Sequence, residues 1–213
     1  MPGPEGLFPH KVGQVDFAKD RMRAQQAAEK ELQKLVQQGL TLKRPVFFVP
    51  GWNDETAICW VEPYTDKNTA TKTWMQRIFS NADEMITYVT FTEESPRCMS
   101  FHDFGAVVVD KIGANTPCDC VGHSMGGLDI SAAISLCEPP LLNVAKFVTY
   151  GSPLRGTEWG ELCHDLASKI LGFAPHIRSH AKNMDPDQQY IKALRTPEAL
   201  KRLFDRVEDM YCV

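Results

Sequence analysis

The stretch that decides the fold of this chain is Cys118–Gly127, with the sequence CDCVGHSMGG. Its last six residues fit the pattern G-x-S-x-G, in which Gly122 and Gly126 flank Ser124. The pattern is typical of a sharp turn from a strand into a helix that exposes the serine hydroxyl. Glycines are expected beside the serine because side chains at those positions would collide across the turn. Ser124 is therefore the first candidate functional residue.

The residues on both sides of the turn decide between a functional site and an ordinary glycine-rich helix cap. Cys118–Val121 is short and largely apolar, which predicts a buried strand, and residues 128–136 contain neither Gly nor Pro, which suits a buried helix. This strand, turn and helix form the context that the pattern requires. A serine so placed becomes a nucleophile when a general base and oxyanion-binding N–H groups are near, so the sequence predicts a serine hydrolase.

Composition limits the class of protein. The chain has 213 residues, 43% of them hydrophobic and 23% charged, which is ordinary for one globular domain over residues 1–213. A net charge of −4 with scattered Lys and Arg predicts no nucleic-acid partner. No stretch approaches the ~20 apolar residues of an integral membrane segment, and the N-terminus lacks a secretory signal. These features, with seven cysteines in no framework spacing, predict a cytoplasmic protein with reduced thiols.

The N-terminal part, residues 1–40, is expected to be an extension followed by a helix over 16–38 that ends at Gly39. The expected apolar face of this helix is formed by Ala28, Leu32, Leu35 and Val36. Its spacing is typical of a helix packed on a core. Next, Val46–Val49 is a continuous apolar run between two prolines, which predicts a strand buried on both faces of a parallel sheet.

Helices and strands then alternate along the chain. The predicted segments are helices over 73–80 and 101–112, strands over 86–91 and 146–150, and the opening of a further strand at 210–213. This alternation indicates βαβ units and an α/β fold. In such a sheet the loops after Val49, Val121 and Tyr150 should converge at one edge and form a crevice there.

Residues 158–206 are predicted to form helices and turns. An apolar stripe within them, Leu162–Leu171, leaves two interpretations open. The segment is either a helical insertion that acts as a lid or a set of crossover helices that cover the sheet, because an amphipathic stripe suits both.

Three segments carry a resemblance to a known family: Val46–Trp52, Val121–Gly127 and Tyr150–Thr157. In them the chain resembles the α/β-hydrolase superfamily, particularly bacterial triacylglycerol lipases and carboxylesterases. The resemblance implies a mostly parallel sheet with helices on both faces. It also implies a small-molecule ester or lipid as substrate, with no cofactor and no metal.

The resemblance further implies roles for individual residues. Ser124 would be the catalytic nucleophile, and the oxyanion hole would take one N–H from Met125 and a second from Trp52. The His-Gly pair that such lipases carry in the first loop is replaced here by Pro50-Gly51. The backbone geometry that the second donor needs remains possible with this replacement.

The acid and the histidine that complete a catalytic triad are not apparent. The candidate bases are His164, His176 and His180, and the candidate acids are Asp165, Asp185, Asp187, Asp205 and Asp209. None of them follows a predicted strand, where the family places them. We expect that the acid and histidine belong to a C-terminal segment beyond residue 213 and that the sheet ends with the C-terminus. The alternative is a base supplied from 158–206.

Two other functions remain as hypotheses. Cys118, Cys120 and His123 could be imagined as metal ligands, but alternate strand positions followed by a turn do not match a zinc-site spacing, so buried strand cysteines are expected. A non-catalytic binding module on the same fold is the rival to the esterase, because a fold does not by itself imply a function.

Overall fold

A computed structural model describes residues 17–51, 57–63, 69–91, 101–113, 116–136, 142–157 and 186–213. Its centre is a five-stranded sheet in the order β2-β1-β3-β4-β5, with every neighbouring pair parallel. The strands are β1 (Val46–Val49), β2 (Ile86–Tyr88), β3 (Pro117–His123), β4 (Asn143–Tyr150) and β5 (Asp209–Cys212). This is the parallel α/β sheet that the alternation of segments predicts.

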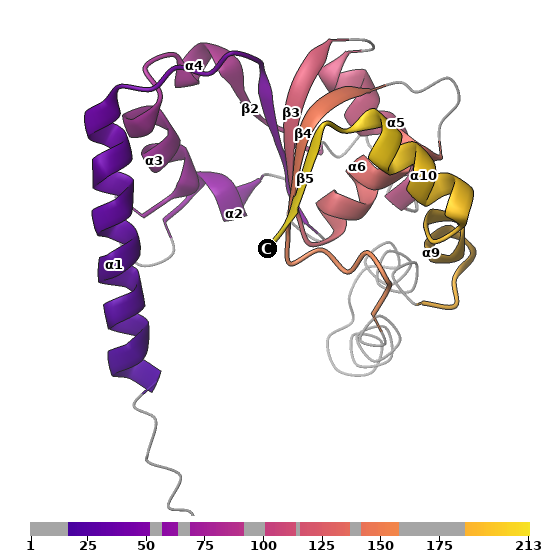
Figure 1. Cartoon of the computed structure of the whole chain (residues 1–213), viewed down its shortest axis with the longest axis horizontal. Coiled ribbons are helices and arrows are strands. Elements are labelled where there is room, and N and C mark those ends of the chain that lie inside the picture. The colour runs from indigo at the N-terminus through magenta and orange to yellow at the C-terminus, as the bar shows by residue number, and fades with distance from the viewer. Residues whose placement is uncertain are drawn as a thin grey trace, which may run out of the picture.

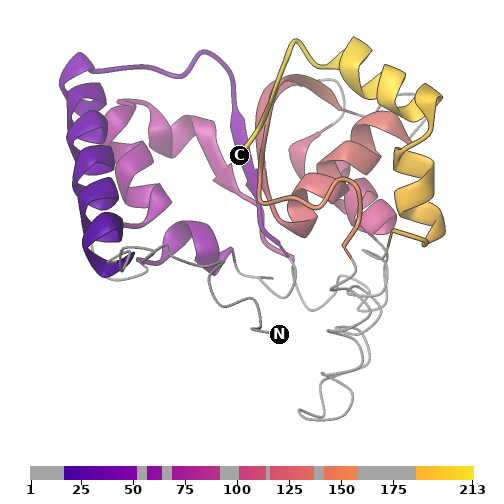
Figure 2. The same cartoon turned by 60° about the horizontal axis from the view of Figure 1, so that its bottom comes forward.

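Helices lie on both sides of the sheet (Figures 1 and 2). One side carries α1 (Phe17–Gln38), α2 (Ile58–Val61), α3 (Thr71–Ile78) and α4 (Ala82–Met85). The other side carries α5 (Phe101–Ile112), α6 (Met125–Ser135), α9 (Gln189–Leu194) and α10 (Pro197–Arg206). The strand β1 is buried at all four positions, because Phe47 and Val49 face the second layer while Val46 and Phe48 face the first.

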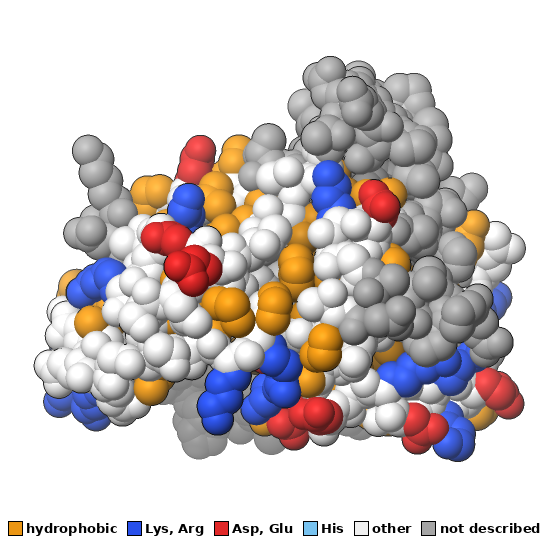
Figure 3. Space-filling view, turned by 90° about the horizontal axis from the view of Figure 1, so that it is seen from above, with side chains coloured by type: hydrophobic (Ala, Val, Ile, Leu, Met, Phe, Trp, Pro, Cys, Tyr) orange, Lys and Arg blue, Asp and Glu red, His pale blue; other side chains and the backbone are white. Residues whose placement is uncertain are grey.

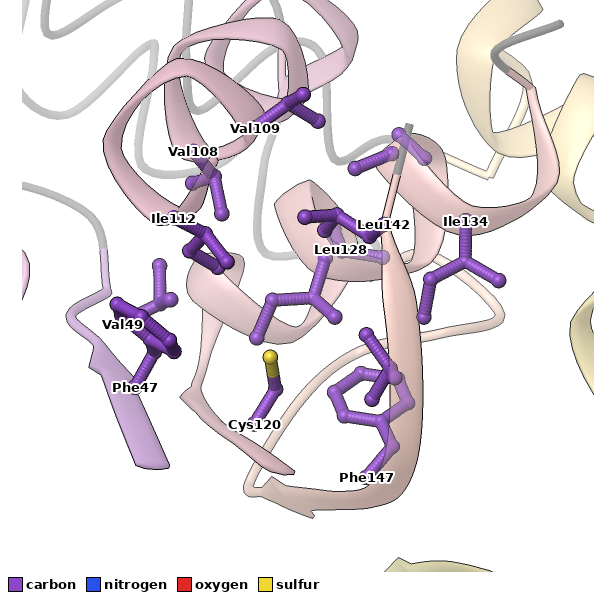
Figure 4. Close-up of a cluster of buried hydrophobic side chains, with 14 of the residues drawn as sticks. Phe47, Val49, Val108, Val109, Ile112, Cys120, Leu128, Ile134, Leu142 and Phe147 are labelled. Carbon is purple, nitrogen blue, oxygen red and sulfur yellow. The ribbon is translucent and has the colours of Figure 1, made fainter. Parts of the chain in front are cut away.

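The larger hydrophobic core lies between the sheet and the layer of α5 and α6 (Figure 4). Leu128 and Ile134 of α6 project into it toward Cys120 and Phe147. All eleven residues of α6 are buried. Such a helix tolerates Ser131 because its hydroxyl donates to the Gly127 carbonyl at 2.7 Å, which satisfies a polar group away from water.

The opposite layer is thinner. Its core consists of Val46, Phe48, Ala57 and Trp60, with Phe48 lying 5.1 Å from Trp60 between ring centroids. The long helix α1 packs beside α3 rather than on the sheet (Figure 1).

Only part of the predicted apolar face of α1 is buried against the rest of the protein. Leu32 and Val36 are half-buried, whereas Ala28 and Leu35 are exposed. The helix α3 covers a narrower strip of the α1 surface than a sheet would cover. This is why only part of the predicted apolar face is buried.

Some element bounds differ from the predicted ones. The strand β2 ends at Tyr88 instead of residue 91, although the next residue, Val89, still donates its N–H to the Phe48 carbonyl at 2.9 Å. The helices α2 and α4 were not expected, because at four residues each they are too short to show a hydrophobic period.

The strand predicted at the C-terminus is present as β5, which pairs with β4 at the edge of the described sheet. The Val213 N–H extends this pairing by donating to the Thr149 carbonyl at 2.8 Å. Within 158–206, the helices α9 and α10 contribute Ile191, Leu194 and Leu203 to the larger core. These two helices are therefore part of the layer that covers one face of the sheet. The remaining residues, 158–185, lie outside the described ones.

Charged side chains of both signs are interspersed on the face shown in Figure 3. Arg44, two residues before β1, pairs with Asp119 of β3 at 3.1 Å, and Lys146 of β4 pairs with Asp209 of β5 at 3.4 Å. Among the helices that the structure describes, none combines the length and hydrophobicity needed to cross a membrane.

Candidate active site

Ser124 occupies the turn between β3 and α6. Its backbone angles are φ 50° and ψ −121°, which lie outside the regions that residues with a side chain normally adopt. Such a conformation costs about 1–3 kcal/mol and persists only where the surroundings fix it. Here the Ser124 N–H donates to the Tyr150 carbonyl at 2.9 Å, and its carbonyl accepts from the Gly127 N–H at 3.2 Å.

The two flanking glycines are required by close approaches of the backbone. A Cβ atom on Gly122 would lie 2.6 Å from the nitrogen of Gly127, so the predicted collision across the turn is correct for this residue. A Cβ atom on Gly126 would instead lie 2.4 Å from the carbonyl oxygen of Pro50. The prediction for Gly126 is therefore corrected, because its neighbour is the end of β1 rather than the other side of the turn.

Loops from three strands meet at Ser124, as the sequence predicts for the carboxyl edge of a parallel sheet. A Cβ atom on Gly51, after β1, would lie 2.8 Å from the Ser124 Cβ. After β4, Ser152 donates its hydroxyl to the Gly122 carbonyl at 3.4 Å. A Cβ atom on Gly127 would lie 2.1 Å from the Ser152 Oγ, so this loop abuts the turn directly.

Met125 is the first residue of α6, where backbone N–H groups have no acceptor within the helix and the positive end of the helix dipole lies. The N–H of Ser124 is already bonded to Tyr150, so it is not available to a ligand. The N–H of Met125 therefore suits the predicted oxyanion donor. The second predicted donor, Trp52, lies outside the described residues, and Gly51 is the last described residue before it.

His123 and the two strand cysteines lie on opposite faces of β3. The His123 ring packs 5.9 Å from the Trp60 ring and 5.9 Å from the Tyr150 ring, between centroids. Cys118 and Cys120 belong to the larger core on the other face, with their sulfurs 3.9 Å apart. One metal ion cannot contact all three side chains in this arrangement.

The contact between the two sulfurs shifts the pKa values of the two thiols in opposite directions. It lowers the pKa of Cys118, whereas the same contact and burial raise the pKa of Cys120 well above its usual range. Among the described residues, Cys118, Cys120 and Cys212 are free thiols.

Asp129, five residues after Ser124, is fully buried on α6. Neither of its carboxyl oxygens has a hydrogen-bond partner within the part of the chain that the structure describes. Burial raises the pKa of this carboxyl well above its usual range, which favours its neutral form. Asp129 was not among the candidate residues predicted from the sequence. It could have been recognised as unusual, because it is an aspartate inside a segment that is predicted to be a buried apolar helix.

A cavity of 550 Å³ lies beside the turn on the face of His123. Its lining is aromatic and polar: Cys59, Trp60, Glu62, Thr69, Ala70, Thr71, His123 and Tyr150. Two of these residues are directly connected to Ser124. His123 precedes Ser124 in the chain, and the carbonyl of Tyr150 accepts a hydrogen bond from the Ser124 N–H. The sequence analysis did not anticipate the contribution of Trp60, although it stands in the apolar run Ile58–Val61.

The candidate acids that the structure describes do not lie at the turn. Asp187 pairs with Lys192 at 3.2 Å, and Asp205 pairs with Lys201 on the same helix. Asp209 begins β5, at the opposite end of the sheet from Ser124.

The remaining candidates lie outside the described residues: His164, His176, His180, Asp165 and Asp185. Leu154, in the loop after β4, lines a separate cavity of 210 Å³ on the α6 side.

The sequence matches no protein-family model and no curated protein. Solved structures are similar to the fold. The lipase BlEst2 of Bacillus licheniformis matches in its propeptide form with 18% identity and a TM-score of 0.50, over 76% of this chain and 36% of that chain. Its mature form matches with 19% identity and a TM-score of 0.49, over 76% and 66%. Phospholipase PlaB of Legionella pneumophila matches with 15% identity and a TM-score of 0.49, over 71% and 34%.

The match thus spans less than two thirds of each of those proteins. At these identities the likeness concerns the fold alone. Together with the parallel sheet and its two helical layers, it shows that the chain has an α/β-hydrolase-like fold of the lipase and esterase kind, as the sequence predicted.

Proposed function

We propose that this chain hydrolyses carboxylic esters through an acyl-enzyme formed on Ser124. The observation that carries the proposal is the strained backbone of Ser124, which is held by the Tyr150 carbonyl and by close glycine contacts. Strain of this kind persists where a function needs it, and here it places a serine at the N-terminus of a buried helix. The lipases and the phospholipase with similar folds make an ester the fitting substrate class.

In the first half of the reaction, the Ser124 oxygen bonds to the carbonyl carbon while its proton passes to a general base. The carbonyl oxygen becomes an oxyanion, which the N–H of Met125 binds together with the positive end of α6. When this intermediate collapses, the bond to the alkoxide breaks and the base returns the proton to the departing alcohol.

In the second half, water attacks the acyl-enzyme carbon and gives its proton to the same base. The bond to Ser124 then breaks, the carboxylic acid leaves, and the serine regains its proton. The proposal takes the second oxyanion donor from Trp52. It leaves the general base unassigned, with His164, His176 and His180 as the candidates that can be tested in this chain. No step requires a cofactor or a metal.

The test is labelling of the chain with a fluorophosphonate probe, followed by hydrolysis of p-nitrophenyl butyrate. We expect labelling and turnover in the wild type and loss of both in Ser124→Ala. As a matched control, Ser152→Ala removes a neighbouring hydroxyl and should still be labelled. Circular dichroism of all three proteins checks that they are folded.

A folded wild-type chain that neither reacts with the probe nor cleaves the ester would contradict the proposal. That result would favour the rival, a binding module on the same fold. If labelling is present, substitution of each candidate histidine by alanine identifies the base as the one whose loss abolishes labelling.

A further inference from the structure

A second cavity continues the one beside His123. It has a volume of 590 Å³ and lies between α1 and α3. Thr69 and Thr71 line both cavities, so the two lie next to each other at the start of α3. Each cavity alone is within the range of about 300–1,000 Å³ that holds a drug-sized ligand, so a groove that uses both suits a longer one.

The chemistry of the groove changes little along its length. Its apolar lining includes Trp60, Ala70 and Trp74, all buried, and the half-buried Met75 and Leu32. Aromatic and aliphatic surface of this kind binds hydrocarbon through the hydrophobic effect.

Charged groups along the groove have both signs. Glu29 and Glu62 are acidic, and Arg77 is basic, with its guanidinium 4.2 Å above the Trp74 ring. Glu29 and Arg77 line the same cavity, so their charges offset each other there, and Glu62 disfavours an anion in the other cavity. The groove has no cluster of one sign to bind an anionic group, and a neutral chain is the occupant that we infer.

We propose that this groove binds the unbranched acyl chain of a long-chain ester, and that α1 is a substrate-binding element. The inference rests on the proposed reaction at Ser124. The scissile carbonyl lies at the turn, the first part of the chain passes His123 and Tyr150, and the distal part runs past Thr71 into the space between α1 and α3.

The other apolar cavity fits this role less well. It has only 210 Å³, and the α6 residue that lines it, Ser131, is seven residues from Ser124. Seven residues of helix correspond to about 10 Å. The groove, by contrast, is lined by the residue that precedes Ser124 and by the residue that accepts its N–H.

The experiment obstructs the distal part of the groove. Ala28→Trp places a large side chain there, and Ala27→Trp is the matched control, because Ala27 is exposed on the same helix and does not line the groove. We measure kcat/KM for p-nitrophenyl palmitate and p-nitrophenyl butyrate. The palmitate-to-butyrate ratio should fall at least about tenfold in Ala28→Trp, since one methylene in an apolar pocket already changes discrimination by about tenfold or more. It should stay at the wild-type value in Ala27→Trp.

A second measurement separates failure of this inference from failure of the proposed reaction. In the Ser124→Ala background, binding of a pyrene-labelled dodecanoate methyl ester is followed by fluorescence. Binding that Ala28→Trp weakens and Ala27→Trp does not supports the groove even if no turnover is found. Two results would contradict the groove but not the reaction at Ser124. In the first, Ala28→Trp hydrolyses both esters with an unchanged palmitate-to-butyrate ratio. In the second, this ratio changes in Phe204→Ala, which alters the smaller cavity, and not in Ala28→Trp.

Discussion

The two faces of the sheet differ in how completely they are packed. On the side of α5 and α6, the core is continuous, and α6 is buried over its whole length (Figure 4). On the side of α1 and α3, the cluster against β1 is smaller, with Val46, Phe48, Ala57 and Trp60 as its buried members, and two neighbouring cavities lie between His123 and α1. The first face holds the Ser124 turn rigid, while the second leaves space beside it. In the proposed reaction, the packed face therefore stabilises the turn, and the other face receives the ester.

The largest effect is expected from a cavity on the packed face. Leu128→Ala removes a fully buried side chain from α6. We expect a loss of about 2–5 kcal/mol in the free energy of unfolding, because the rigid surroundings cannot close the cavity. Urea denaturation followed by circular dichroism measures it. A loss below about 1 kcal/mol would show that this face is not rigidly packed.

A smaller effect should come from the contact between the turn and the loop after β4. Gly127→Ala places a Cβ 2.1 Å from the Ser152 Oγ, and overpacking of this kind costs about 1–3 kcal/mol. Ser152→Gly removes the opposing side chain, so the double variant should recover most of the lost stability. A double-mutant cycle by urea denaturation measures the coupling, and additive losses would contradict the contact.

The buried carboxyl of Asp129 makes the packed face sensitive to pH. Its pKa is raised in the folded protein, so above the unfolded value of about 4 unfolding releases a proton and the free energy of unfolding falls as pH rises. The slope is about 1.4 kcal/mol per pH unit until the folded pKa is reached. Asp129→Asn cannot titrate and should lose this slope. Urea denaturation between pH 4 and 7 compares the two proteins, and parallel curves would show that the carboxyl has another partner.

The smallest effect is expected from Leu32→Ala on the open face. Leu32 is half-buried between α1 and α3, so the same change of side chain as in Leu128→Ala should cost only about 1 kcal/mol. The same urea titration applies. If Leu32→Ala is as destabilising as Leu128→Ala, the two faces are equally packed and the groove is not open.

The parts of the fold that could be predicted from the sequence are those that depend on residues close together in the chain. The run Val46–Val49 is apolar at every position because both faces of β1 are covered, and this was visible without the structure. The turn at Ser124 was equally visible, because Gly122 is required by an approach that occurs within six residues of chain.

Other features depend on contacts between distant segments and were therefore not predictable. The exposure of Leu35 follows from α1 packing beside α3 rather than on the sheet, and the close approach of Gly126 is to Pro50. The cavity lined by Trp60, Thr71 and Tyr150 joins three segments that have no common local pattern.

The sequence by itself determined the parallel α/β sheet, the position of Ser124 at its carboxyl edge and the need for glycine at the turn. These features arise from hydrophobic period and backbone sterics, which act between neighbouring residues. Only the tertiary structure decided which face is packed, where the cavities lie and that Asp129 is buried with no hydrogen-bond partner among the described residues. Burial and cavity shape are properties of segments brought together from far along the chain, and no local pattern encodes them.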